Sequence, residues 1–195
     1  MRITGGTALN RKLKTPGSGK REIIRPTSDR VREALFNILG DRVAGARILD
    51  LFAGTGSLGI EALSRGASYA VFVDKNALSL NLIRSNLQSC FKQADVEIIR
   101  LSLTSESAYI SLHKRLSGRN MFDLIFLDPP YEKKLAETAL TMVEKTGLIA
   151  QNGYVIAEER SKIYLPEEIG SLHLRQKRNY GETGIWIYQA AVIRQ

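Results

Sequence analysis

Cysteine and histidine are scarce in this 195-residue sequence. Cys90 is its single cysteine, so no disulfide can form within the chain, and we expect a reducing compartment, the cytoplasm. His113 and His173 stand alone, without cysteine or carboxylate partners at ligand spacing, so we predict no metal site. No stretch approaches the roughly 20 apolar residues that cross a bilayer, and the start lacks the apolar stretch of a signal peptide. We therefore expect no membrane partner, and the 44% hydrophobic composition suits a single globular domain.

Acidic residues are nearly absent from the start of the chain. Residues 1–26 carry seven basic side chains against Glu22 alone, a net charge of +6 out of the total of +8. We predict a basic hairpin arm over these residues, in which Met1–Thr4 pairs with Glu22–Arg25 around a mobile tip at Gly17–Gly19. The concentrated charge favours an arm that binds nucleic-acid phosphates, although a solvated tail is the alternative. The candidate phosphate contacts are Arg11, Lys12, Lys14, Lys20, Arg21 and Arg25.

From residue 47 onward, apolar runs alternate with stretches of helical spacing. The runs predict strands at 48–52, 70–73, 96–99, 124–127 and 154–157, and the spacing predicts helices at 58–64, 77–90, 105–116 and 135–145. This alternation is typical of an α/β fold with a mainly parallel sheet. Residues 171–176 and 185–190 predict an antiparallel hairpin at the sheet edge. Pro26-Thr27-Ser28-Asp29 begins a further helix that extends to Gly40.

A glycine loop follows the first predicted strand, in the sequence Asp50-Leu51-Phe52-Ala53-Gly54-Thr55-Gly56. Such a loop turns sharply and approaches a nucleoside cofactor closely, but dinucleotide-binding proteins share it. Asp50 could attract the α-ammonium of S-adenosylmethionine, whereas it would repel a pyrophosphate. Asp74 ends the second predicted strand and could accept hydrogen bonds from ribose hydroxyls. These features favour S-adenosylmethionine, and the alternative is that Asp50 only caps or pairs within the fold.

The motif Asp128-Pro129-Pro130-Tyr131 follows the apolar run of the fourth strand, at the end where open α/β sheets bind ligands. Asp128 and the carbonyl of Pro129 could accept hydrogen bonds from a nucleobase amine and direct its lone pair at a methyl donor. Two prolines remove two N–H donors and stiffen the turn. Tyr131 offers a ring on which the base could stack, worth about 1–3 kcal/mol. The motif therefore predicts methylation of an exocyclic amine, against an alternative reading as an ordinary proline turn.

With these motifs, the chain resembles the RsmD-type methyltransferases, which modify a guanine N2 amine in small-subunit ribosomal RNA. The resemblance extends over nearly the whole length and rests on 2–6, 25–37, 50–66, 122–131 and 180–183. It implies a Rossmann-like class I methyltransferase domain with seven strands and the last strand antiparallel. It also implies S-adenosylmethionine as donor and 16S rRNA, in a 30S subunit or an assembly intermediate, as partner of a monomeric enzyme.

The resemblance also divides the chain into parts and adds site residues. Residues 1–195 would be one methyltransferase domain, with the arm at 1–26, a helix over the cofactor site at 27–40 and the Rossmann-like core at 47–195. Thr27 and Arg30 would contact the cofactor. An acidic residue that such enzymes commonly carry after the third strand is missing here, so the adenine contact would fall to Ser102 or to backbone.

We weigh three alternatives to an rRNA guanine-N2 methyltransferase, the first within the same class and the other two outside it. An N6-adenine methyltransferase acting on DNA or RNA would need the same amine-binding motif. A nicotinamide-dependent oxidoreductase would use the glycine loop but leaves Asp50 and residues 128–131 unexplained. A non-catalytic RNA-binding module would have no need of an intact loop and motif.

Overall fold

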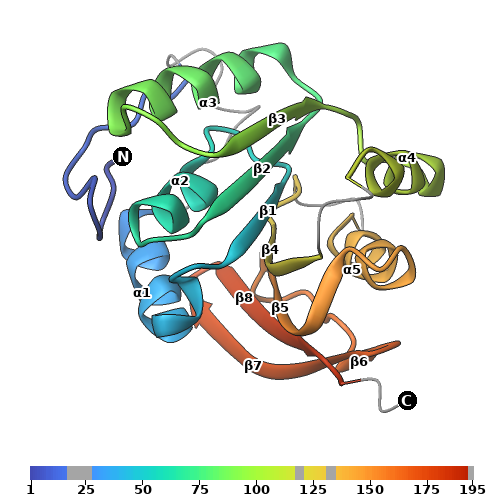
Figure 1. Ribbon diagram of the computed structural model, residues 1–195. Coiled ribbons are helices and arrows are strands. Elements are labelled where there is room, and N and C mark those ends of the chain that lie inside the picture. The colour runs from blue at the N-terminus through green and yellow to red at the C-terminus, as the bar shows by residue number, and fades with distance from the viewer. Residues whose placement is uncertain (17–27, 117–120, 131–134, 193–195) are drawn as a thin grey trace. The chain divides into compact units, whose positions relative to one another are not determined.

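The computed structural model describes residues 1–16, 28–116, 121–130 and 135–192 (Figure 1). They divide into two units, Met1–Leu101 and Ser102–Gln195. In the first unit, three strands pair in parallel in the order β3-β2-β1: β1 (Arg47–Leu51), β2 (Tyr69–Asp74) and β3 (Val96–Arg100). Every side chain of β2 is buried, as expected of a parallel strand covered on both faces.

The helices of the first unit begin and end where their sequences supply caps. They are α1 (Asp29–Leu39), the 3₁₀ helix η2 (Gly40–Val43), α2 (Ser57–Ser64) and α3 (Ala77–Cys90). Ser28 caps α1, since its side chain accepts a hydrogen bond from the N–H of Val31 at 3.2 Å. Gly40 ends the helix with a positive φ of 54°. The predicted helix over 26–40 is therefore confirmed from Ser28 onward.

The second unit contains two helices, α4 (Glu106–Leu116) and α5 (Leu135–Lys145), and five strands. The strands are β4 (Phe122–Leu127), β5 (Ile149–Arg160), β6 (Glu168–Ile169), β7 (Leu172–Tyr180) and β8 (Thr183–Ala190), in the order β4-β5-β8-β7-β6. β4 and β5 run parallel, whereas β8 runs antiparallel to both β5 and β7. Trp186 and Tyr188 on β8 are buried packing residues, at 1% and 0% exposure.

The predicted α/β fold with its last strand antiparallel is confirmed, but the number of strands is not. The described residues contain eight strands instead of seven. The additional strand β6 is two residues long and pairs with the start of β7 around Gly170, whose φ is 57°. So short a strand leaves no periodic pattern in the sequence. β5 also begins at Ile149, five residues earlier than predicted. The sequence pattern did not reveal this start because Asn152, with a left-handed φ of 60° next to a bulge in the β4–β5 pairing, interrupts the apolar run.

The beginning of the chain forms a local pairing that was not predicted, while the predicted hairpin with Glu22–Arg25 stays a prediction. Arg2 pairs with Lys12 in an antiparallel bridge, and Ile3 and Leu13 are bonded to Arg11 and Met1 by backbone hydrogen bonds of 2.9 and 3.1 Å. The expected pairing partner, Glu22–Arg25, lies outside the described residues, as does the expected tip at Gly17–Gly19. Ile3, Ala8 and Leu13 are at most 5% exposed, so residues 1–16 (the N-terminal segment) are packed into the first unit instead of forming a free arm.

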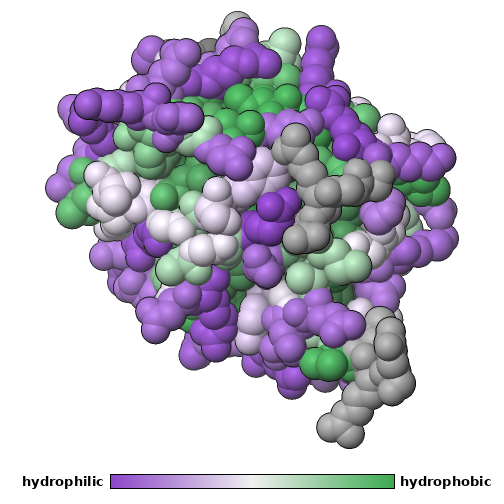
Figure 2. Space-filling model, viewed as in Figure 1, coloured by the Kyte–Doolittle hydropathy of each residue, from purple (hydrophilic) through white to green (hydrophobic). Residues whose placement is uncertain are grey.

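The hydropathy of part of the surface is drawn in Figure 2. The face drawn in Figure 2 is mostly hydrophilic, with apolar residues in small groups. Among the described residues, no helix combines the length and the apolar character needed to cross a membrane.

Candidate active site

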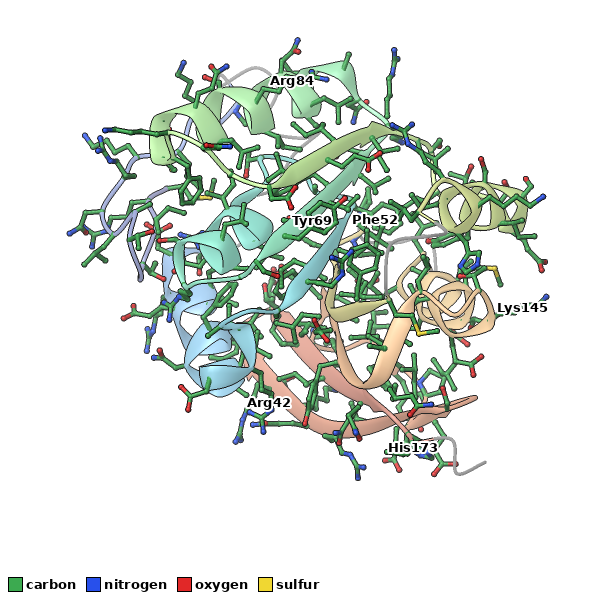
Figure 3. The ribbon with its side chains drawn as sticks, in the orientation of Figure 1. Arg42, Phe52, Tyr69, Arg84, Lys145 and His173 are labelled. Carbon is green, nitrogen blue, oxygen red and sulfur yellow. The ribbon has the colours of Figure 1, made fainter. Side chains whose placement is uncertain are left out.

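The glycine loop (Phe52–Gly56) connects β1 to α2 and has unusual backbone conformations. Phe52 lies just beyond the end of β1 (Figure 3) and has a positive φ of 62°, which is rare for a residue with a side chain. Gly54 and Gly56 have φ values of 55° and 76°. Left-handed backbone of this kind at a non-glycine residue costs on the order of 1–3 kcal/mol and is found most often at functional sites. Strain of this kind is typical of ligand-binding loops, and cofactor binding by this loop stays a prediction.

Asp50 lies beneath the loop with its carboxyl group almost fully buried. Its Oδ2 atom accepts a hydrogen bond from the N–H of Gly59 at 2.9 Å, and the residue is 2% exposed. A side chain at Gly59 would bring a Cβ within 2.4 Å of the Phe72 ring, so only glycine lets α2 approach this closely.

Burial raises the pKa of Asp50 to about 8; the Gly59 hydrogen bond lowers it in part, and the nearby Asp74 carboxylate raises it further. A carboxyl group with this pKa is mostly protonated at neutral pH until a cation is placed beside it. The bond from Gly59, in the first turn of α2, is a capping contact of the kind named in the alternative. Binding of a positively charged group by Asp50 stays a prediction.

Asp74, at the end of β2, holds the glycine loop from the other side. Its Oδ2 accepts from the N–H of Gly54 at 2.9 Å and its Oδ1 accepts from the N–H of Asn76 at 2.8 Å. Each carboxylate oxygen can accept a second hydrogen bond, so these two contacts leave Asp74 able to accept the predicted bonds from ribose hydroxyls. Ala53 and Thr55, both buried, complete the loop, with the N–H of Ala53 bonded to the carbonyl of Val73 at 3.0 Å.

Sequence reasoning missed a buried ionic cluster on α2, centred on Glu61. Glu61 and Arg32 are both 0% exposed, and Nε of Arg32 lies 3.1 Å from Oε2 of Glu61. Arg65 pairs with the other carboxylate oxygen at 2.8 Å. Thr4 donates to Glu61 through its N–H and its hydroxyl, at 2.9 and 2.8 Å. The signal in the sequence was a carboxylate among the apolar residues of α2, and this carboxylate fixes α1 and the N-terminal segment to the helix that the glycine loop begins.

Two glycines let the N-terminal segment lie against the end of α2. A Cβ on Gly6, whose φ is 76°, would lie 1.8 Å from the carbonyl oxygen of Ser64. A Cβ on Gly5 would lie 2.5 Å from the guanidinium of Arg65. The Ser64 hydroxyl donates to the carbonyl of Gly5 at 2.6 Å and accepts from the N–H of Ala8 at 2.9 Å. The Arg-Ile-Thr-Gly-Gly sequence at the start is therefore a structural anchor.

In the second unit, the amine-binding motif follows β4 directly, as predicted. Asp128 is half-buried, Pro129 is buried and Pro130 is exposed. β4 itself is buried from Leu124 to Leu127, which fixes the position of Asp128 at its carboxyl end. Tyr131 lies outside the described residues.

Some of the remaining predicted site residues are exposed, and the others lie outside the described residues. Arg11, Lys12, Lys14, Arg30 and Ser102 are exposed. Thr27, Lys20, Arg21 and Arg25 lie outside the described residues. Among the residues that are described, no group of three or more histidine, cysteine or acidic side chains could hold a metal ion.

Comparison with known proteins places the chain in a family. Residues 1–189 match the family described as "Conserved hypothetical protein 95". The ribosomal RNA small subunit methyltransferase D of Escherichia coli K12 is 33% identical over 190 residues, 97% of this chain and 89% of that protein. A Bacillus subtilis protein assigned as an rRNA methyltransferase is 36% identical over 189 residues, 97% of this chain and 98% of its own length.

A solved structure agrees with these relatives. That of an Escherichia coli protein described as a methyltransferase matches with a TM-score of 0.81 at 28% identity and covers 98% of both chains. The glycine loop, the amine-binding motif and the N-terminal anchor all lie within the matched residues 1–189. The chain therefore belongs to the RsmD family of methyltransferases.

Proposed function

We propose that the chain is an S-adenosylmethionine-dependent methyltransferase that modifies the exocyclic N2 amine of a guanine in the 16S rRNA of the small ribosomal subunit. The observation that carries the proposal is the buried carboxyl group of Asp50 beneath the glycine loop. A buried carboxyl group favours a ligand that brings its own cation, and the α-ammonium of S-adenosylmethionine is such a cation. A nicotinamide dinucleotide would instead bring a pyrophosphate, which Asp50 would repel.

S-adenosylmethionine, when bound, supplies a methyl group on a sulfonium, which is a good leaving group. In the first unit, Asp50 would pair with the ammonium, and Asp74 would accept hydrogen bonds from the ribose while holding Gly54. Phe52, Ala53, Thr55 and Gly56 would contribute loop backbone and the Phe52 ring. Thr27, Arg30 and Ser102 are proposed as further cofactor contacts. These residues would bind and orient the donor without taking part in bond making.

The acceptor side of the reaction is assigned to the second unit. The carboxylate of Asp128 and the carbonyl of Pro129 would accept hydrogen bonds from the base amine, which would orient its lone pair. Pro130 would keep the turn rigid, and Tyr131 would stack on the base once it has left its helix. The same arrangement would serve an adenine N6 amine, so the choice of guanine N2 is supported by the family and not by the motif.

The proposal also names a partner. We infer that the substrate is 16S rRNA within a 30S subunit or an assembly intermediate, bound by a monomer of this chain. The name of the Escherichia coli relative supports the ribosomal substrate. The net charge of +6 on residues 1–26 supports contact with phosphates, through Arg11, Lys12, Lys14, Lys20, Arg21 and Arg25.

Transfer of a tritiated methyl group tests the proposal directly. Purified protein would be incubated with labelled S-adenosylmethionine and, in separate reactions, 30S subunits, protein-free 16S rRNA and duplex DNA, followed by nucleoside analysis. We expect N2-methylguanosine from the ribosomal substrates alone. N6-methyladenosine would replace the proposed function by its alternative, and absence of label from every substrate would overturn it.

A further inference from the structure

One buried amide connects the glycine loop to the basic N-terminal segment. Asn86, on α3, is 0% exposed. Its Oδ1 atom accepts a hydrogen bond from the N–H of Lys14 at 2.7 Å, and its Nδ2 atom donates to the carbonyl of Lys14 at 3.1 Å. The same Nδ2 donates to the carbonyl of Thr55, in the centre of the glycine loop, at 3.0 Å. The three backbone groups that Asn86 contacts all lie in the first unit. Two of them are carbonyl acceptors and one is an N–H donor, so together they fix which way the amide of Asn86 points.

The environment of Asn86 gives packing no reason to prefer an amide. Ile83 and Leu87 on the same helix are 0% and 7% exposed, so Asn86 has apolar neighbours along the buried face of α3. Arg84, by contrast, is an exposed residue of the same helix (Figure 3). A buried amide is tolerated only when its hydrogen bonds are made. Here the bonds of Asn86 join Lys14 to Thr55, which are about forty residues apart in sequence. The bonds themselves are therefore the reason for this residue.

Lys14 has a backbone that is held by hydrogen bonds and a side chain that is exposed. Its N–H and carbonyl are both bonded to Asn86, and its Nζ donates to the hydroxyl of Ser85 at 2.8 Å. An ammonium has three N–H donors, so two remain for a phosphate. At the other end of the connection, the Thr55 peptide lies between Gly54 and Gly56, two residues with left-handed backbone. The N–H of this peptide, on Gly56, donates to the carbonyl of Ala53 at 2.7 Å, and Asn86 bonds its carbonyl end.

We propose that Asn86 is a positioning residue that couples RNA binding at the N-terminal segment to cofactor binding at the glycine loop. The inference rests on the proposed function. RNA phosphates that hold Lys14 in place also hold Asn86, and Asn86 holds the Thr55 peptide in the conformation of the loop. Cofactor affinity therefore rises when RNA is bound, and RNA affinity rises by the same factor when the cofactor is bound.

The test compares the dissociation constant of S-adenosylhomocysteine for the protein alone and for the protein saturated with purified 16S rRNA, both by calorimetry. For the wild type we expect binding at least about fivefold tighter with RNA, the lower end of typical coupling between sites. In Asn86→Ala the ratio falls to near one. The matched control is Ser79→Ala: Ser79 lies on the same helix at 0% exposure, and its hydroxyl has no partner among the described residues. This control keeps the wild-type ratio.

A second pair of variants leaves Asn86 in place. Lys14→Pro removes the N–H that Asn86 accepts, and Lys14→Ala removes the same charge but keeps that N–H. Both weaken RNA binding and both lower the ratio, because Lys14→Ala loses the phosphate contact and Lys14→Pro also loses the bond that joins Lys14 to Asn86. A wild-type ratio of one, or an unchanged ratio in Asn86→Ala and Lys14→Pro, overturns the coupling and leaves the proposed function standing. A wild type that does not bind S-adenosylhomocysteine at all overturns the proposed function itself.

Discussion

At the scale of single residues, Asp50 makes the most specific prediction, because its pKa in the unliganded protein is raised to about 8. The carboxyl group is therefore mostly protonated at pH 6.5, whereas the cofactor's ammonium favours the ionised form. Binding should release up to about one proton per molecule at this pH, and affinity should increase as the pH rises towards 8. Calorimetry in buffers of different ionisation enthalpy measures the released protons.

Asp50→Asn is the matched variant, since its side-chain oxygen can still accept from Gly59. It should bind the cofactor more weakly and release no proton. Stability gives an independent check. Because the folded pKa lies above the unfolded value of 3.8, the unliganded protein should be most stable below about pH 4 with respect to this group. Its free energy of unfolding should then fall as the pH rises to about 8 and level off above it. Equal pH slopes in wild type and variant would contradict the raised pKa.

Asp128 is proposed to bind the amine of the acceptor base, so its removal should affect methyl transfer and not cofactor binding. We expect Asp128→Ala to lower the rate of methyl transfer about 100-fold or more, the typical loss when one group that stabilises a transition state is removed. Asp128→Asn keeps an acceptor oxygen and should retain part of the activity. Single-turnover transfer to 30S subunits gives the rate, and calorimetry with S-adenosylhomocysteine should show an unchanged dissociation constant. Full turnover by Asp128→Ala would exclude the amine-binding role.

At the scale of elements, Glu61 joins α2, α1 and the N-terminal segment. Glu61→Ala leaves the guanidinium of Arg32 buried without its main carboxylate partner, and this should destabilise the protein by about 3–5 kcal/mol. Urea unfolding measures the loss. The exposed ion pair between Lys145 and Glu106 is the control, with side chains 58% and 50% exposed. Glu106→Ala should cost at most about 1 kcal/mol. A Glu61→Ala variant as stable as this control would show that the buried cluster contributes nothing.

At the scale of the whole molecule, the uneven charge predicts how RNA binding responds to salt. Arg11→Gln with Lys12→Gln removes two exposed cations from the N-terminal segment and leaves its buried residues in place. Each phosphate that these cations no longer neutralise should flatten the slope of log K against log salt by about 0.7–0.9, with no change in cofactor affinity. Filter binding to 16S rRNA at several salt concentrations measures the slope.

Removal of residues 1–20 would be a poor test, because Ile3, Ala8 and Leu13 belong to the core. Lys114→Gln with Arg115→Gln, on α4, is a better control for general charge, since both residues are exposed. An unchanged slope in the Arg11 and Lys12 variant would mean that other cations bind the RNA, such as Arg175, Lys177 and Arg178.

The sequence by itself determined the alternation of strands and helices and the two motifs. These depend on local spacing. The buried faces of α3 and α5 repeat at helical periods, and Asp50 lies near the end of one strand and Asp128 directly after another. The helices α2, α3, α4 and α5 accordingly begin within one residue of the predicted positions. Features with no periodic pattern, such as β6 and the early start of β5, were missed for the same reason.

Only the tertiary structure decided what the N-terminal segment does. The bonds of Thr4 to Glu61 and of Lys14 to Asn86 join residues 57 and 72 positions apart, and nothing in the local sequence indicates which residues will meet. The raised pKa of Asp50 likewise depends on burial beneath α2, which the order of residues along the chain does not reveal. Local spacing encodes secondary structure, whereas burial and long-range polar contacts appear only when the elements pack. This is why a stretch that reads as a charged tail is an anchored part of the first unit.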